Sequence, residues 1–140
     1  MQAVGLPCVK LLVEGVLGAQ RCPVAGTRGT YRTEWGAPFE RVWIQGTVCE
    51  RTDAGLNLKD SSGAVIAVVV TSRLPGLDLA SIVPGDYCLV VGPVAEDPTG
   101  PRYVRAHKVI NLTAELVDVV LRAEQWQAEV KEACALPLAP

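Results

Sequence analysis

The residues of this sequence that could do chemistry are few and far apart. His107 is the only histidine, so a serine, cysteine or aspartate nucleophile has a single imidazole that could act as its base. The carboxylates are scattered, and no pair has the spacing of an acid–base or metal–carboxylate site. No P-loop or G-x-G-x-x-G phosphate loop is present. We therefore expect a protein that is not an enzyme and that needs no cofactor.

The cysteines do not form a metal-binding pattern. Structural zinc sites commonly take their ligands from close pairs, and this sequence has no C-x-x-C pair. We expect reduced thiols that pack as small apolar side chains, and no bound metal. Their odd number also indicates a reducing compartment. The five residues are Cys8, Cys22, Cys49, Cys88 and Cys134.

The charge balance limits the partners of the chain. Lysine and arginine number 13 against 15 aspartates and glutamates, so the molecule lacks the positive field of a non-specific nucleic-acid binder. Lys10 and Glu14 interrupt the apolar N-terminus, and we expect no signal peptide. No run reaches the roughly 18 uncharged apolar residues of a membrane span. Contact with DNA is therefore expected to be weak, local or shared with a partner, and no membrane contact is expected.

A small basic and aromatic set remains as a candidate contact for a peptide or for single-stranded nucleic acid, which binds aromatic platforms flanked by cations. Arg105 and Lys108 could equally be solvated charges that block pairing at a strand edge. The second and third expected strands carry no aromatic residue, which argues against independent DNA binding. The set comprises Trp43, Arg105 and Lys108, with Arg102, Tyr103 and His107 beside them.

The elements that must position these residues are short strands. From Arg41 to Arg51 apolar and polar residues alternate, and Gly46 would permit a sharp bend or bulge there. Leu56 to Lys59 alternates in the same way, and the turn residues Asp60-Ser61-Ser62-Gly63 close a hairpin. Ala64 to Val70 is apolar on both faces, so its outer face requires cover from the tails or from another chain.

The order of the remaining elements predicts the fold class. The amphipathic piece Leu77 to Ile82 is expected to form a helical turn that plugs one end of a barrel. The fourth strand is expected over Tyr87 to Val94 and the fifth over Tyr103 to Ile110. Five strands with a short helix between the third and the fourth define an OB-fold, a partly open Greek-key barrel. We predict an all-β protein of this type with a C-terminal α-helix.

That terminal helix is expected from Ala114 to Glu132, with Thr113 as its N-cap. Its apolar stripe forms the candidate partner-binding set, and Val117 and Leu121 add a second apolar flank. The alternative is a helix that only covers its own barrel. The predicted partner-binding residues are Leu116, Val119, Val120, Ala123, Trp126 and Val130.

The predicted organisation has four parts. Residues 1–40 form an N-terminal extension that packs on the barrel, and residues 41–112 form the OB-fold core. Residues 113–134 form the interaction helix. Residues 135–140 form a tail in which the prolines prevent the helix from continuing.

Several blocks resemble the RecQ-mediated genome instability protein 2 family. They read PCVKLLVEGVL, VWIQGTV, NLKDSSG, VPGDYCLVVGPV, AHKVINLT and QWQAEV, and they follow one another in the family's order over most of the chain. The opening PC motif and the V-x-I-x-G strand are also distantly similar to the middle subunit of replication protein A. The blocks span Pro7–Leu17, Val42–Val48, Asn57–Gly63, Val83–Val94, Ala106–Thr113 and Gln125–Val130.

The resemblance implies a non-catalytic nuclear scaffold of the Bloom helicase and topoisomerase III alpha assembly, which dissolves double Holliday junctions in DNA repair. It implies an obligate heterodimer with the OB-fold sister subunit, RecQ-mediated genome instability protein 1, and a docked peptide of the Fanconi anaemia M helicase. Trp126 and Val130 match the family's W-x-x-E-V pattern, and Lys108 matches the lysine of its last strand. The resemblance thus makes Trp126 a partner anchor and Lys108 a surface contact. The alternative function is a single-stranded DNA-binding module of a replication protein A-like or telomere complex.

Overall fold

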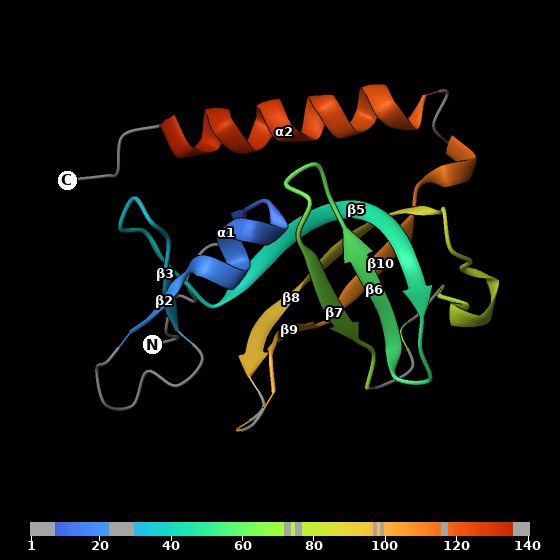
Figure 1. Cartoon of the computed structure of the whole chain (residues 1–140), viewed down its shortest axis with the longest axis horizontal. Helices are drawn as coiled ribbons and strands as arrows, with labels where there is room; N and C mark the ends of the chain where they lie inside the picture. Colours follow the sequence, from blue (N-terminus) through green and yellow to red (C-terminus); the bar gives the residue numbers. More distant parts are fainter. Residues whose placement is uncertain are drawn as a thin grey trace, which may run out of the picture.

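The computed structural model describes residues 8–22, 30–71, 74, 77–96, 98, 100–115 and 118–135. A closed barrel forms its centre (Figure 1). Its strands are β5 (Arg41–Arg51), β6 (Gly55–Lys59), β7 (Val65–Val69), β8 (Tyr87–Glu96) and β9 (Arg102–Arg105). The predicted all-β class and the predicted OB-fold are confirmed.

The pairing of the strands closes the barrel. β5 pairs antiparallel with β6, and β6 pairs antiparallel with β7. β7 then pairs with β9 in parallel, whereas β9–β8 and β8–β5 are antiparallel. Because β8 returns to β5, with Ile44 opposite Val90, neither of these two strands has a free edge along that pair.

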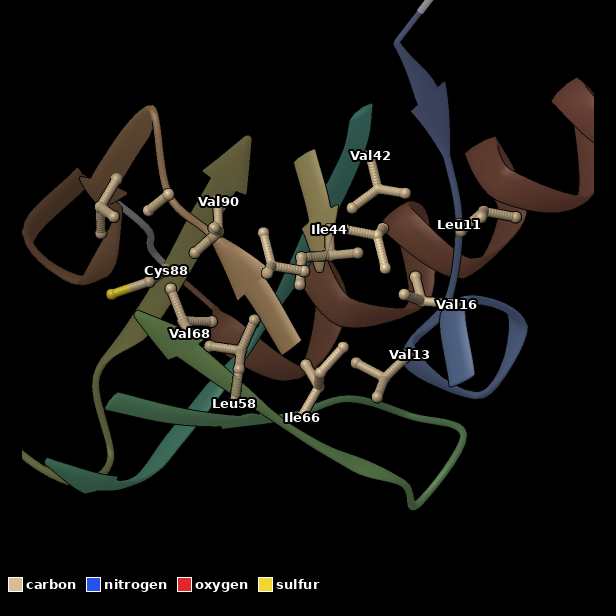
Figure 2. Packing of buried hydrophobic residues seen from close by; sticks show 14 of the residues in the cluster. Leu11, Val13, Val16, Val42, Ile44, Leu58, Ile66, Val68, Cys88 and Val90 are labelled. Atoms are coloured by element: carbon tan, nitrogen blue, oxygen red, sulfur yellow. The ribbon is translucent and has the colours of Figure 1, made fainter. Parts of the chain in front are cut away.

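The core fills the barrel with aliphatic side chains from alternate positions of the strands. Val42, Ile44 and Val48 of β5 are fully buried, as the alternation along that strand predicts. Val13 and Val16 come from the short helix α1 (Val13–Gly18) and join the same cluster, in which Figure 2 shows them beside the barrel residues. The helix α1 therefore contributes its buried side chains to the core of the barrel.

Of the bend or bulge predicted at Gly46, the bulge is absent. The register shift of β5 lies between Val48 and Glu50, so the bulge is not at the glycine. A Cβ atom at Gly46 would lie 2.6 Å from the backbone oxygen of Lys59. Gly46 is therefore required by the close approach of β6 to β5.

The prediction of one fifth strand over Tyr103 to Ile110 is wrong in one respect. The structure has two strands in this region. The amide of Ala106 donates to Val69 of β7, whereas the next amide, that of His107, donates to Val91 of β8. The chain changes partner at this point, so β9 ends at Arg105 and β10 (Lys108–Asn111) pairs with β8.

The predicted helical turn before the fourth strand is present as the 3₁₀ turn η1 (Leu79–Ser81), which Asp78 caps by accepting from the amide of Ala80. Ile82, the last residue of the predicted piece, is buried in the core. This short helix lies between the third and fourth barrel strands, where the OB-fold requires it.

The N-terminal residues add a small second sheet. Its strands are β2 (Gln20–Arg21), β3 (Tyr31–Arg32) and β4 (Pro38–Phe39), while β1 (Val9–Lys10) pairs in parallel with β5. Tyr31 and Phe39 stack with their ring centroids 5.9 Å apart.

The C-terminal helix begins later than predicted. Thr113 lies in the 3₁₀ turn η2 (Thr113–Glu115), and its Oγ1 accepts from the amide of Tyr87 at 2.7 Å, so it is not the N-cap of the long helix. That helix, α2, runs over Val119–Ala135. Asp118 caps it, because its Oδ1 accepts from the amide of Leu121 at 3.1 Å. α2 lies across one side of the barrel, over β5 (Figure 1).

Candidate partner-docking surface

The inner face of α2 packs on the chain's own barrel. Trp126 is 1% exposed and Val130 is also buried, so both side chains face inward. The Trp126 ring lies 5.9 Å from the ring of Trp43 on β5, measured between centroids. Both indole N–H groups are buried without a hydrogen-bond partner among the described residues. The contact between the two indoles therefore depends on ring packing and involves no hydrogen bond of either indole N–H within the described residues.

A set of polar and charged side chains, the α2 clamp, links the helix to the strands beside the two indoles. Lys10 Nζ lies 4.9 Å from the Trp43 ring centroid and 5.8 Å from that of Trp126. Glu129 pairs with Lys10 at 3.7 Å and with Arg122 at 2.9 Å. Arg122 Nε also donates to Gln45 Oε1 at 3.1 Å. The clamp, Lys10, Gln45, Arg122 and Glu129, therefore joins α2 to β1 and β5.

The outer flank of α2 is apolar and uncovered. Val120 is 68% exposed and Leu121 is 50% exposed, both in the first turn of the helix. A cavity of about 320 Å³ opens between this half of α2 and the strands β5 and β6. Ala123 and Trp126 line it from the helix, and Gly46, Cys49 and Tyr87 line it from the barrel. An exposed apolar turn beside an apolar hollow is a surface that a partner can cover.

The structure divides the predicted partner-binding residues into three groups. Trp126 packs against Trp43 of the barrel, and Val130 is buried. Val119 and Ala123 are half-buried, and Val120 is exposed. Leu116 and Val117 lie outside the described residues.

The face of β7 that points away from the core is also partly open. Val65 is 45% exposed, and Ala67 and Val69 are half-buried, whereas Ile66 and Val68 on the other face are buried. The doubly apolar third strand thus leaves apolar area outside the barrel.

The candidate nucleic-acid residues do not form one surface. Trp43 lies under Lys10 and against Trp126, so its ring faces are occupied. Arg105 and Lys108 are exposed, at the end of β9 and the start of β10.

Arg102, the third cation of that region, is engaged within the fold. It forms an ion pair with Glu96 at 2.9 Å and donates to the carbonyls of Val16 and Ala19 at 2.8 and 2.7 Å. Its guanidinium also lies 4.6 Å from the Tyr31 ring centroid. Arg102 therefore ties α1 and β3 to the barrel and has little capacity left for a phosphate.

The titratable groups near the cavity do not resemble a reactive site. Burial raises the pKa of the Cys88 thiol to about 12, and the nearby Asp86 carboxylate adds to the rise. Burial also raises the pKa of Tyr87 to about 12, against an opposing effect of Arg122. The thiol and the phenol stay protonated at neutral pH. In the described part of the chain no group of three or more metal-ligating side chains comes together.

The α2 clamp was not found by sequence reasoning. Lys10 and Glu129 are separated by most of the chain, and no local pattern links them. The sequence offers one weak indication of this contact, a tryptophan in an expected barrel strand, Trp43, and another in the expected terminal helix, Trp126.

A family model matches nearly the whole chain. The model of RecQ-mediated genome instability protein 2 covers residues 7–134. No curated protein sequence matches the chain. None of the helices in the described part of the chain has the length and the apolar composition of a membrane-spanning segment.

Solved structures share the fold at low identity. A chain of the S. pombe Stn1–Ten1 complex has a TM-score of 0.61 at 16% identity, covering 94% of this chain and 97% of that one. A chain of a replication protein A heterotrimer bound to single-stranded DNA has a TM-score of 0.64 at 16% identity, covering 94% and 95%. The telomere capping protein Ten1 from Saccharomyces pombe has a TM-score of 0.58 at 15% identity, covering 90% of this chain and 99% of that one. These similarities confirm the OB-fold. The family match shows that this chain is an OB-fold protein of genome maintenance and belongs to the RecQ-mediated genome instability protein 2 family.

Proposed function

We propose that this chain is a non-catalytic scaffold subunit that pairs with another OB-fold protein through the outer flank of α2. The observation that carries the proposal is the exposure of Val120 and Leu121 on the helix whose Ala123 and Trp126 line an apolar cavity. Burying an exposed aliphatic side chain contributes roughly 1 to 3 kcal/mol, so two neighbouring ones form an effective anchor.

The family and the fold support this proposal. Two of the similar structures are named as parts of a complex, the Stn1–Ten1 complex and the replication protein A heterotrimer. The inner stripe of α2 is used within the chain, so a partner would meet the flank and not Trp126. The partly open face of β7, with Val65 at its edge, offers a second area for cover.

The finer part of the proposal concerns the partner. The family match supports the sister subunit, RecQ-mediated genome instability protein 1, as the second OB-fold protein. The pair would work in the nucleus, within the topoisomerase III alpha and Bloom helicase assembly that dissolves double Holliday junctions. A Fanconi anaemia M helicase peptide would dock on the pair, and Lys108 is a candidate contact because it is exposed.

Co-purification with the sister OB domain tests the pairing. Val120→Asp combined with Leu121→Asp should abolish the complex, because it places two charges in an apolar interface. Val83→Asp is the matched control, since Val83 is 52% exposed but lies beside η1, far along the chain from α2. Equal recovery of the sister domain by the double variant and the control would refute the proposal.

A second candidate function is the binding of single-stranded DNA, favoured by one observation. Arg105 and Lys108 are both exposed, and neither takes part in an ion pair within the described residues. Fluorescence anisotropy with a labelled oligonucleotide at low salt tests it, since phosphate contacts are strongest there. Binding that Arg105→Ala with Lys108→Ala weakens would support this function, and no binding at low salt would remove it.

A further inference from the structure

A second hollow lies at the other end of α2, and we refer to it as the α1–α2 groove. Its volume is about 600 Å³, which is within the usual range for sites that hold a ligand or a side chain. Leu11 and Val130 are the buried apolar residues that line it, and Trp35 is half-buried at its side. Gly15 and Gly18 of α1 line it without side chains, which keeps the groove open.

The rim of the α1–α2 groove is acidic. Glu14 and Glu34 line it, both are exposed, and neither carboxylate has an ion pair or a hydrogen bond within the described residues. Lys131 is the basic lining residue, and it is likewise unpaired within that part of the chain. An apolar groove with this excess of carboxylates attracts cations and repels phosphates, so nucleic acid is a poor occupant.

The groove is separate from the surface that carries the proposed pairing. Val120 and Leu121 lie in the first turn of α2, whereas Val130 lies ten positions after Val120 in the same helix. At 1.5 Å of rise per residue these positions are about 15 Å apart. The two sites therefore have no residue in common, and they can be altered and tested separately.

We propose that the α1–α2 groove docks a short peptide segment of a partner protein, one that carries a large apolar side chain flanked by lysine or arginine. The apolar side chain lies against Trp35 and Val130, where an aromatic ring gains the most contact area. The flanking cations lie beside Glu14 and Glu34 at the rim and give the docking its specificity. This inference does not depend on the pairing through α2.

Selection of phage-displayed random peptides on the full chain provides the test. The enriched peptides should combine an aromatic or large aliphatic residue with lysine or arginine. Their affinity is then measured by fluorescence anisotropy against the full chain and its variants. Failure to enrich any peptide, or enrichment of acidic ones, would overturn the proposal.

Two groove variants locate the binding. Gly18→Phe fills the groove, and its fold should survive because no atom lies within 4 Å of a Cβ at this position. Glu14→Lys with Glu34→Lys reverses the rim without touching the apolar floor. Each variant should weaken the enriched peptides about tenfold or more, by obstruction or by charge repulsion.

The control carries the same charge change elsewhere. Glu50→Lys with Glu124→Lys alters two exposed glutamates that do not line the groove, and it should bind the peptides almost as well as the unaltered chain. Equal weakening by this control would mean that net charge alone attracts the peptides, and the proposal would fail. It would fail as well if sedimentation showed a dimer that Gly18→Phe dissociates, because the occupant would then be a second copy of the chain.

Discussion

The ring of Trp126 lies 5.9 Å from the ring of Trp43, at an angle of 38° between their planes. This contact joins the last helix to the first barrel strand, across most of the length of the chain. With Lys10 over both rings, the pair forms the centre of the attachment of α2. Trp126, which matches the family's anchor position, therefore packs within its own chain. A substitution of Trp126 should lower the stability of the isolated chain, in addition to any effect it has on partner binding.

Replacing Trp126 with alanine should lower the free energy of unfolding by about 3 to 5 kcal/mol, because it leaves a cavity against Trp43. Urea denaturation of the isolated chain measures this change. Leu121→Ala on the exposed flank is the control and should change stability by about 0.5 kcal/mol or less. If Trp126→Ala weakened only the complex with the sister domain and left the isolated chain unchanged, the packing of α2 described above would be wrong.

Arg102 should matter for stability and not for nucleic-acid binding. Arg102→Ala removes the ion pair with Glu96 and the bonds to the carbonyls of Val16 in α1 and of Ala19 just after it, so we expect a loss of about 2 to 3 kcal/mol in the free energy of unfolding. Arg105→Ala is the matched control, since Arg105 is exposed on the same strand, and its expected effect is within about 0.5 kcal/mol. Similar denaturation midpoints for the two variants would contradict the assignment.

Asp60 fixes the start of α1 from a distant hairpin. Its Oδ2 accepts from the amide of Val13 at 2.6 Å, so Asp60→Ala leaves that helix end without its acceptor. The substitution also removes the bonds that Oδ1 accepts from the amide and the hydroxyl of Ser62. We expect a loss of about 1 kcal/mol, the usual cost of removing a helix cap. Thermal melts measure this loss. Asp53→Ala, at an exposed turn with no hydrogen bond of its carboxylate to the described residues, should cost less in these melts. An equal shift for both would show that charge, and not the bond to Val13, is responsible.

Stability should fall at alkaline pH because Tyr87 is buried. Its pKa is raised from the ordinary value of 10 to about 12, so the unfolded chain loses the phenol proton before the folded chain does. The stabilisation is complete below pH 10 and is lost as the pH rises from 10 towards 12. Tyr87→Phe should reduce this alkaline loss by up to about 2 kcal/mol, and urea melts at neutral and alkaline pH measure it. An unchanged alkaline slope in Tyr87→Phe would assign the loss to other groups, such as Cys88.

The sequence alone determined the barrel strands whose signal is local. β5 has the predicted bounds, Arg41 to Arg51, because side chains of a strand alternate between faces and the pattern needs no other element to be visible. The hairpin turn at Asp60 to Gly63 is equally local, since Gly63 has a φ of 85° that glycine adopts without strain. The order of strands that predicts the OB-fold, and most of the blocks that resemble the family, lie in these locally recognisable strands and turns.

Only the tertiary structure decided which surfaces are covered. The sequence predicts Thr113 as the N-cap of the long helix, but the hydroxyl of Thr113 accepts from the distant amide of Tyr87, and Asp118 caps α2. In the same way, the inward orientation of Trp126 depends on Trp43 and Lys10, which are far away along the chain. Periodicity identifies an apolar stripe, but it cannot tell a stripe that packs on its own barrel from one that a partner covers. That distinction depends on contacts between distant segments, which exist only once the chain has folded.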